Sequence, residues 1–457
     1  MFDRFLQRKI GFRALLRLGL VGLIVFVLFG AVVRVAAVGD DRYGLIGRIA
    51  LHIASIPVNF RKGMSLVLHG EKEDLKTVEN RFAGQTAFQF SYPPGSAEDA
   101  EYLLLSRYDG DRKRSVVELV DMNTQALLHR WAPDFAAINA RSELVSNLVD
   151  LERDRTPSRV RVMHPLLLDD GDLVYQDMSP LVRVGPCGEI RWTIDRLFHH
   201  SNEVHSEGGF WLELFLEPQT ISGVSKTFKE DAIVHVSPDG EILFEKSVPE
   251  LLIENGLAHF VYGLDFYSDD PTHLNDVQQA IEDTRFWKKG DVFLSLRNVS
   301  AIVLYRPSEN RVVWLKQGPW VNQHDVDILD DHRIAVFNNN RFNYNTASAV
   351  DGFNSVMIYD FSTDVVSSPY ADGMKKHEVR TISEGRSEIY QDGQVFLEES
   401  NYGRAMRLDQ TGEIVWQYVN RGSDGQLYRL NWSRVIPREI GDSVARKLAE
   451  LRCPGIG

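Results

Sequence analysis

A strand, a tight turn and a second strand, often ending in an aromatic residue, recur along most of this chain. Clear copies are LVRVGPCGEIRW at 181–192, IVHVSPDGEILF at 233–244, IVLYRPSENRVVW at 302–314 and AMRLDQTGEIVW at 405–416; weaker copies lie at 116–131 and 356–370. These six copies are roughly 50 to 70 residues apart, the size of a four-stranded unit repeated around a ring. The pattern predicts an all-β fold, a six-bladed β-propeller. A large β-sandwich is the competing fold, but it requires no such regular repeat.

The charge and cysteine content exclude several classes of protein. Lys and Arg number 51 against 64 Asp and Glu, which gives a net charge of −13 and argues against nucleic acid as a partner. Two cysteines, Cys187 and Cys453, are too few for a disulfide scaffold or a cysteine-rich zinc module. One disulfide between them is compatible with the sequence, which does not decide the pairing.

The N-terminal part of the chain has the pattern of a membrane helix. Residues 18–33 contain no charged side chain, and with Arg34 snorkelling the apolar segment extends to residue 38, close to the ~20 residues that a bilayer requires. Five basic residues and one acid precede it. The positive-inside rule therefore predicts a cytoplasmic N-terminus, a single anchor in the inner membrane and a periplasmic remainder. Val35-Ala36-Ala37 resembles a cleavage site, so a cleaved signal sequence is the alternative.

Composition and spacing divide the chain into five predicted parts. They are a basic cytoplasmic leader (1–17), the transmembrane anchor (18–38), a juxtamembrane amphipathic segment (39–61), the propeller (62–436) and a C-terminal helical tail (437–457). The juxtamembrane segment has apolar residues at helical spacing, which suits a helix on the membrane surface or one that packs on the folded domain. The sequence does not predict the oligomeric state.

Histidine and arginine residues interrupt the strands at equivalent places. The channel-side ends of propeller blades converge although they are far apart in sequence, so polar residues there can form one site. His164, at the start of an early strand, is one candidate. The other candidate segments are His199-His200, His273-Leu274-Asn275, Ser295-Leu296-Arg297, Gln323-His324 and Phe337-Asn338-Asn339.

Taken in order, these segments resemble the bacterial arylsulfate sulfotransferases, propeller enzymes that transfer a sulfuryl group without a nucleotide donor. The family's pattern runs from a paired His through His-x-Asn and a Ser-x-Arg strand end to Gln-His before a strand ending Phe-Asp-Asn. The resemblance spans roughly residues 160 to 420, and Asn338 stands where the family has Asp. It implies an aryl sulfate donor, a phenolic or other hydroxyl acceptor, and no cofactor.

The resemblance also implies a role for each matched residue. His324 would attack the sulfur, form a sulfohistidine and pass the group on; a neutral imidazole suits this role because its ordinary pKa is about 6.5. Arg297 would hold the sulfuryl oxygens, a task that fits an always charged guanidinium. His273 and His200 would add donors or protonate the aryl oxygen. The expected substrate contacts among them are Asn275, which could instead orient His273, and His199, Gln323 and Asn338. His164 is a further expected contact, from its place at the start of a strand rather than from the resemblance.

Several other interpretations stay open. Three histidines can bind zinc, but no matched carboxylate or short ligand spacing accompanies them, so no metal is predicted. The run Asp169-Asp170-Gly171-Asp172 resembles part of a calcium loop, but a hairpin turn explains it better. The alternative function is a non-catalytic, membrane-anchored propeller that binds a glycan, a lipid or a protein partner. A hydrolase that passes the sulfuryl group to water is a third, closely related function.

Overall fold

The computed structural model describes residues 12–37, 41–50, 52–54, 56, 75–77, 79–344, 347–451 and 453. The chain divides into two compact units, residues 1–73 and 74–457. Most of the predicted leader and the predicted start of the propeller at residue 62 lie outside the described residues.

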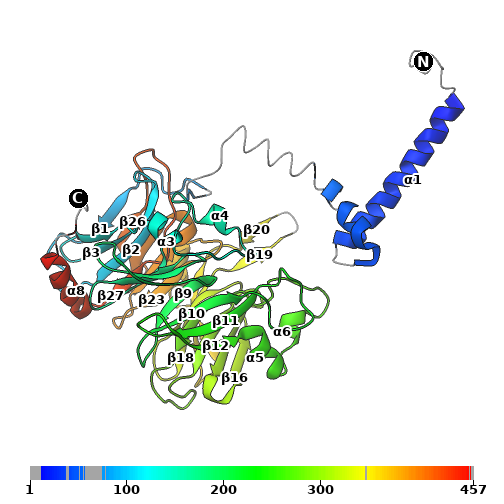
Figure 1. Ribbon diagram of the computed structural model, residues 1–457. Helices are drawn as coiled ribbons and strands as arrows, with labels where there is room; N and C mark the ends of the chain where they lie inside the picture. The colour runs from blue at the N-terminus through cyan, green and yellow to red at the C-terminus, as the bar shows by residue number, and fades with distance from the viewer. Residues whose placement is uncertain are drawn as a thin grey trace. The chain divides into compact units, whose positions relative to one another are not determined.

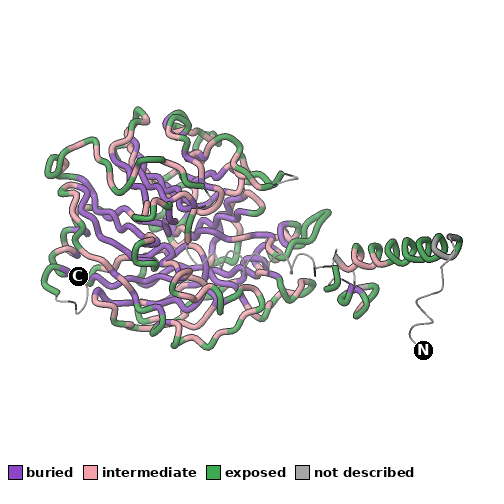
Figure 2. Tube along the Cα trace, turned by 90° about the horizontal axis from the view of Figure 1, so that it is seen from above, coloured by how far each residue is buried: buried purple, intermediate pink, exposed green. Residues whose placement is uncertain are grey.

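The first unit contains, among its described residues, one helix long and apolar enough to cross a membrane. Helix α1 (Phe12–Ala37) includes a candidate span of 21 residues, Leu16–Ala36. At about 1.5 Å per residue this length matches the hydrocarbon core of a bilayer. Most of its residues are exposed (Figure 2), and the large apolar ones from Leu16 to Leu28 are among them, as expected for a helix that lipid would cover. A 3₁₀ turn, η1 (Asp41–Tyr43), and helical residues 44–50 and 52–54 follow.

The second unit is a six-bladed β-propeller, which confirms the fold class predicted from the repeat (Figure 1). From the innermost strand outward, the first three blades are β27 (Arg434–Ile436), β2 (Tyr102–Asp109), β3 (Arg114–Asp121) and β4 (Ala126–Trp131); β5 (Met163–Leu167), β6 (Leu173–Gln176), β7 (Leu181–Val184) and β8 (Ile190–Ile194); and β9 (Phe198–Val204), β10 (Phe210–Leu216), β11 (Glu230–Val236) and β12 (Ile242–Ser247). The other three are β13 (Leu274–Gln279), β14 (Val292–Leu296), β15 (Ala301–Arg306) and β16 (Arg311–Gln317); β17 (His324–Ile328), β18 (Arg333–Asn338), β21 (Ser355–Asp360) and β22 (Val365–Ser367); and β23 (Arg386–Ile389), β24 (Val395–Glu399), β25 (Arg404–Leu408) and β26 (Ile414–Val419).

Additional elements decorate this ring. Strand β1 (Ala87–Phe90) pairs with β26 as a fifth, outer strand of the last blade, and a hairpin of β19 (Arg341–Asn343) and β20 (Ser348–Val350) extends from the β18–β21 connection. Short helices lie in the connections: α3 (Phe135–Asn139), α4 (Leu151–Asp154), α5 (Val248–Glu254), α6 (His259–Tyr262), η2 (Pro307–Glu309), α7 (Ala371–Lys376) and η3 (Ser400–Tyr402).

Each copy of the sequence repeat forms the two outer strands of one blade. The turn between them needs a left-handed residue, which glycine supplies at Gly188 and Gly240 (φ 90° and 87°). The aromatic residue that ends a copy packs on the next blade: the Trp192 ring lies 6.4 Å from Phe210 and the Trp314 ring 5.2 Å from Tyr359. The hydrophobic core therefore lies mainly between neighbouring blades. Figure 2 shows that buried residues run through the interior of this unit.

The last strand of the chain closes the ring. Strand β27 pairs with β2, so the first blade takes its innermost strand from the end of the chain. Glu398, fully buried in β24 of the last blade, accepts hydrogen bonds from the backbone N–H groups of Trp432 (2.8 Å) and Ser433 (2.7 Å), just before β27. The Ser400 hydroxyl donates a third bond to the same carboxylate (2.7 Å). Glu398 thus ties the last blade to the strand that completes the first.

The C-terminal tail is fastened to the first two blades. Helix α8 (Arg438–Glu450) buries Val444 and Leu448 in the cluster that also contains Tyr102. Gly441 permits this approach, because a Cβ there would lie 2.0 Å from the Tyr102 ring. Cys453 forms a disulfide with Cys187, in the β7–β8 turn, with a Cα–Cα distance of 5.0 Å. The structure thus decides the pairing that the sequence left open.

Replacing Glu398 with Ala should destabilise the propeller. The substitution leaves two buried backbone N–H groups without an acceptor, which should lower the free energy of unfolding by about 3 kcal/mol. Urea unfolding of the purified protein would measure the loss. The control is Glu241→Ala, in the exposed β11–β12 turn. Equal midpoints for the two variants would contradict the role assigned to Glu398.

Candidate functional site

The six innermost strands begin at one end of the ring, each at or beside a non-glycine residue in the left-handed backbone region. The sheet register shifts at the start of β5, β9, β13 and β17, where the innermost strand holds unpaired residues. Such bulges re-aim side chains away from the regular ladder and are typical of functional sites. We call this end of the ring the site end. The six left-handed residues taken from the starts of these strands are His164 (φ 45°), His200 (54°), His273 (50°), Asp325 (49°), Glu384 (57°) and Trp432 (65°).

His324, the first residue of β17, is buried at the site end. Its Nδ1 lies 2.7 Å from Asn339 Oδ1, and its Nε2 accepts a hydrogen bond from the backbone N–H of Glu384 (3.1 Å). The Asn339 amide nitrogen donates to the carbonyls of Thr381 and Glu384, so its oxygen faces His324 as an acceptor. Nδ1 therefore carries the proton. Burial, and then the charge of Arg297, place the pKa of His324 well below its ordinary value, so the ring is neutral near pH 7.

His200 lies beside His273 and His324. Its ring is 5.0 Å from that of His273 and 6.3 Å from that of His324. Burial, and then the neighbouring histidines, lower the pKa of His200 well below its ordinary value. Its Nδ1 lies 2.7 Å from Nδ1 of His199, so one of these two rings donates to the other.

His199 supports His200 from the blade side. The His199 ring is 1% exposed and stacks on Phe215, with centroids 3.9 Å apart. Its Nε2 lies 3.3 Å from a carboxylate oxygen of Asp231, whose other oxygen accepts from the backbone N–H of Leu274 (3.0 Å). Asp231, His199 and His200 thus form a row of polar groups from the core to the site.

His273 is held by a carboxylate. Its Nδ1 donates to Asp270 across 2.7 Å, and each of these side chains is about one fifth exposed, at 20% and 22%. Although burial opposes it, the hydrogen bond and charge of His273 and the charge of Lys229 lower the pKa of Asp270 to about 2. Asp270 is therefore ionised and fixes the His273 tautomer with the proton on Nδ1.

Arg297 follows β14 and supplies the positive charge of the site. Burial, and then the nearby Arg341, lower the pKa of Arg297 to about 10, so the guanidinium stays charged at neutral pH. One nitrogen, Nη1, donates to Asn298 Oδ1 (2.9 Å), while the buried Nε has no partner among the described residues. This leaves donor capacity for an anion.

Three of the residues predicted to contact substrate form hydrogen bonds with backbone groups in this structure. Asn275 donates to the carbonyl of Gln323 (3.0 Å), and the Gln323 amide donates to the carbonyl of Ala301 (3.1 Å). Asn338 accepts from the backbone N–H of Val321 (2.8 Å). The residue that departs from the family's Asp therefore holds the segment just before β17. A substrate contact for these residues stays a prediction.

His164 lies among the acidic residues of the channel. Its Nδ1 accepts from the backbone N–H of Asn202 (2.9 Å), its Nε2 is 3.6 Å from Glu203, and its ring contacts Trp432 with centroids 4.5 Å apart. Burial, and then the charge of Arg434, hold the pKa of His164 well below its ordinary value. Trp432 also lies 6.2 Å from His324, which places this indole between the two histidines.

Buried carboxylates join neighbouring inner strands. Asp276 of β13 accepts from the backbone N–H of Val326 in β17 (2.8 Å), and Asp325 of β17 accepts from that of Ser387 in β23 (2.7 Å). Burial raises the pKa of Asp276 to about 8, with help from the charge of Glu203, and that of Asp325 to about 6. These acids position the strands that carry the histidines.

Five contributors to the site were not predicted from the sequence. In the sequence Asn339 stands out only as the end of a motif. Asp270 could have been found as a carboxylate three residues before His273. Glu384 acts through its backbone, and Trp432 and Arg341 lie in connections without a motif.

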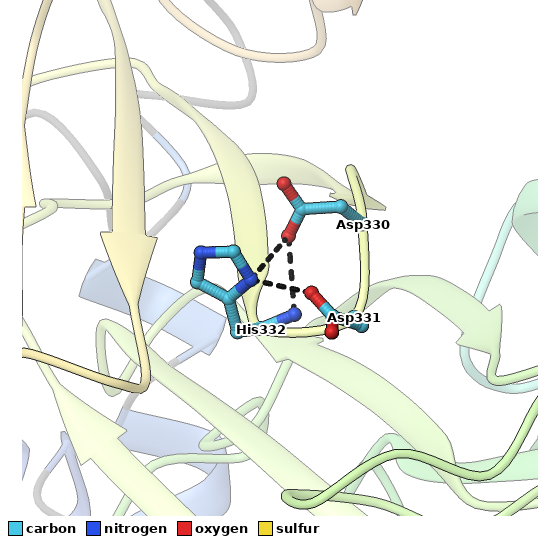
Figure 3. Close-up of side chains that lie close together, drawn as sticks. All are labelled: Asp330, Asp331 and His332. Atoms are coloured by element: carbon cyan, nitrogen blue, oxygen red, sulfur yellow. Dashed lines mark hydrogen bonds and ion pairs between the residues drawn. The ribbon is translucent and has the colours of Figure 1, made fainter.

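Among the described residues, one group of candidate metal ligands converges within 4.8 Å: Asp330, Asp331 and His332 (Figure 3). It occupies the β17–β18 turn, at the opposite end of β17 from His324. His332 Nδ1 bonds to Asp331 (2.5 Å) and lies 3.2 Å from Asp330, which also pairs with Arg333. Hydrogen bonds and ion pairs within the turn therefore explain why these three side chains lie close together.

The solved structures that are similar to this chain are only distantly so. A protein of unknown function from Bacteroides caccae has a TM-score of 0.45 at 11% identity and covers 74% of this chain and 99% of its own. The virginiamycin B lyase of Staphylococcus aureus has a TM-score of 0.36 at 10% identity and covers 74% of this chain and 91% of its own. No curated protein matches the sequence.

Comparison with protein families gives a clear result. The arylsulfotransferase (ASST) family model matches residues 164–421, more than half of the chain. The matched segment begins at His164 and contains the histidines and the arginine gathered at the site end. The chain therefore belongs to the arylsulfotransferase (ASST) family.

Proposed function

We propose that this protein is a nucleotide-independent sulfotransferase that moves a sulfuryl group from an aryl sulfate to a phenolic or other hydroxyl acceptor through a sulfohistidine at His324. The observation that carries the proposal is the state of His324. Its imidazole is buried and neutral, its Nδ1 proton is held by Asn339, and its lone pair is on Nε2, where it accepts a hydrogen bond from the backbone N–H of Glu384. A ring in this state is a nucleophile.

In the first half-reaction Nε2 of His324 forms a bond to sulfur while the bond between sulfur and the aryl oxygen breaks. The electron pair leaves with the aryl oxygen, which takes a proton from Nε2 of His273 and departs as the phenol; the acceptor later gives its proton back to the same nitrogen. Nε2 must first release the backbone N–H of Glu384, which then can donate to a sulfuryl oxygen. In the second half-reaction the acceptor oxygen bonds to sulfur, the N–S bond breaks, and the acceptor loses its proton.

The surrounding side chains suit the charges that develop. Arg297 has an unused Nε donor for the sulfuryl oxygens. His273, with its Nδ1 proton fixed by Asp270, is suited to exchange a proton with the aryl oxygen at Nε2. The ring of His200 lies beside the rings of His273 and His324, and His200 can donate a hydrogen bond to the sulfuryl group.

We propose that α1 anchors the protein in the inner membrane with the propeller in the periplasm. Basic residues before the helix favour a cytoplasmic N-terminus. The Cys187–Cys453 disulfide also fits this placement, because disulfides persist in oxidising compartments.

Replacing His324 with Asn should abolish transfer. The variant lacks the nucleophile, so release of 4-nitrophenol from 4-nitrophenyl sulfate in the presence of phenol should fall by about 10³-fold or more. His332→Asn, which removes a histidine of the opposite end, is the matched control and should keep full activity. Transfer that survives in the His324 variant would refute the proposal. Release that does not depend on phenol would identify a hydrolase.

Asn339 should act as a positioning residue. Asn339→Ala leaves the His324 tautomer unfixed and should lower kcat by about 10- to 100-fold with little change in KM. Asn339→Asp keeps an acceptor but adds a negative charge, which favours the imidazolium. As the pH falls, Asn339→Asp should therefore lose its activity at a higher pH than the wild type does. Matching pH profiles for wild type and Asn339→Asp would exclude this role.

The first half-reaction should tolerate mild acid. The pKa of His324 is lowered in the folded protein, so its neutral form persists below the ordinary value of about 6.5. The pre-steady-state burst of 4-nitrophenol should keep its rate as the pH falls from about 7.5 to about 6. A burst rate that halves near pH 6.5 would show an unperturbed nucleophile.

A further inference from the structure

A cavity of about 360 Å³ adjoins the candidate site on the site end of the ring. It lies between the 259–271 segment, the β14–β15 turn, the residues before β17 and the β19–β20 hairpin. Its walls divide into a polar part (Asp270, Asn298 and Asn322) and an apolar part (Phe260, Phe266 and Val299). A cavity of this volume suits a small organic ligand.

The polar wall is shared with the candidate site. Asp270 holds His273 at 2.7 Å, and Asn298 accepts from Arg297 Nη1 at 2.9 Å. Asn298 also donates to the carbonyl of Asp270 (2.7 Å), so a hydrogen bond joins these two residues of the polar wall. A ligand whose anionic end lies against Arg297 and His273 therefore has the cavity directly beside it.

The apolar wall presents an aromatic side chain that nothing in the described protein covers. Phe266 is 89% exposed, whereas the neighbouring Phe260 is 8% exposed. Leu264, two residues away in the same turn, is 86% exposed as well. A ligand ring that lies against Phe266 would remove apolar surface from water, which favours binding.

The turn that carries Phe266 is fixed from both sides. Gly263 has φ 71°, and a Cβ there would lie 2.2 Å from the carbonyl oxygen of Phe266, so only glycine fits. On the other side Tyr267 Oη accepts from the backbone N–H of Ser225 (2.9 Å), and Asp269 accepts from the Ser225 hydroxyl (2.6 Å). The backbone that carries Phe266 is therefore held at the cavity.

We infer that this cavity binds the aromatic ring of the substrates, with Phe266 as a specificity-determining residue. The inference rests on the proposed function for the identity of the anionic group at Arg297. The donor product leaves before the acceptor binds in a double-displacement reaction, so one ring site serves both the aryl sulfate and the phenol. The volume also leaves room for a fused two-ring aromatic.

The test uses two sulfonates that cannot transfer their sulfur group. 1-Naphthalenesulfonate carries a ring and methanesulfonate does not, and calorimetry on the full chain in detergent measures the Kd of each. Wild type should bind the naphthalene probe at least about tenfold more tightly than methanesulfonate. Phe266→Ala should raise the Kd of the naphthalene probe by about tenfold and leave the Kd of methanesulfonate unchanged.

Leu243→Ala provides the matched control. Leu243 is 58% exposed on the outer strand β12, away from the cavity, and its replacement should change neither Kd. Equal affinities of Phe266→Ala and Leu243→Ala for the naphthalene probe would overturn the inference, as would a wild type with no preference for the ring.

A third variant separates this inference from the proposed function. His324→Asn cannot form a sulfohistidine but keeps the cavity, so its preference for the naphthalene probe over methanesulfonate should stay within about threefold of that of the wild type. Failure of the transfer assay with a preserved ring preference would reject the chemistry and leave the ring site standing. Intact transfer without a ring preference would reject the ring site alone.

Discussion

Closure of the ring is the constraint on which the rest of this structure depends. Strand β27 must return to β2 before the six inner strands can surround one channel, and Glu398 holds the backbone just ahead of that strand. The side chains of the candidate site come from four different blades and their connections, so no single blade contains the site. The core between neighbouring blades supplies the apolar burial, while the inner strands are joined by buried carboxylates such as Asp276 and Asp325.

The closed ring also sustains the strained backbone that builds the site. Six non-glycine residues in the left-handed region, each costing on the order of 1 kcal/mol or more, sum to a free energy comparable with the net stability of a domain. They persist because strands on both sides over-determine them. Their effect is to bring His200 and His273 beside His324, with Arg297 arriving from the next strand, and to bury His324 in a neutral state.

The fold was predictable because its signal is local. The outer strand pairs carry a glycine turn and an interblade aromatic residue in each repeat, and the ordered histidine motifs identify the blades that contribute to the site. The details were not predictable because they depend on tertiary contacts. Asn339 rather than Asn338 contacts His324, since the residues at the end of β18 alternate between the two sides of the strand. Glu384 contributes a backbone N–H, and the cavity beside Phe266 is made by four separate segments. No local pattern encodes either feature.

The central claim is that the sulfuryl group resides on His324 between the two half-reactions. The most direct measurement mixes the full-length protein with 4-nitrophenyl sulfate without an acceptor, quenches it in alkali, and maps the added mass by peptide fragmentation. The account predicts one sulfuryl group, located on His324 and lost when phenol is added before the quench. A sulfuryl group on His200 or His273, or steady transfer with no modified peptide, would contradict it.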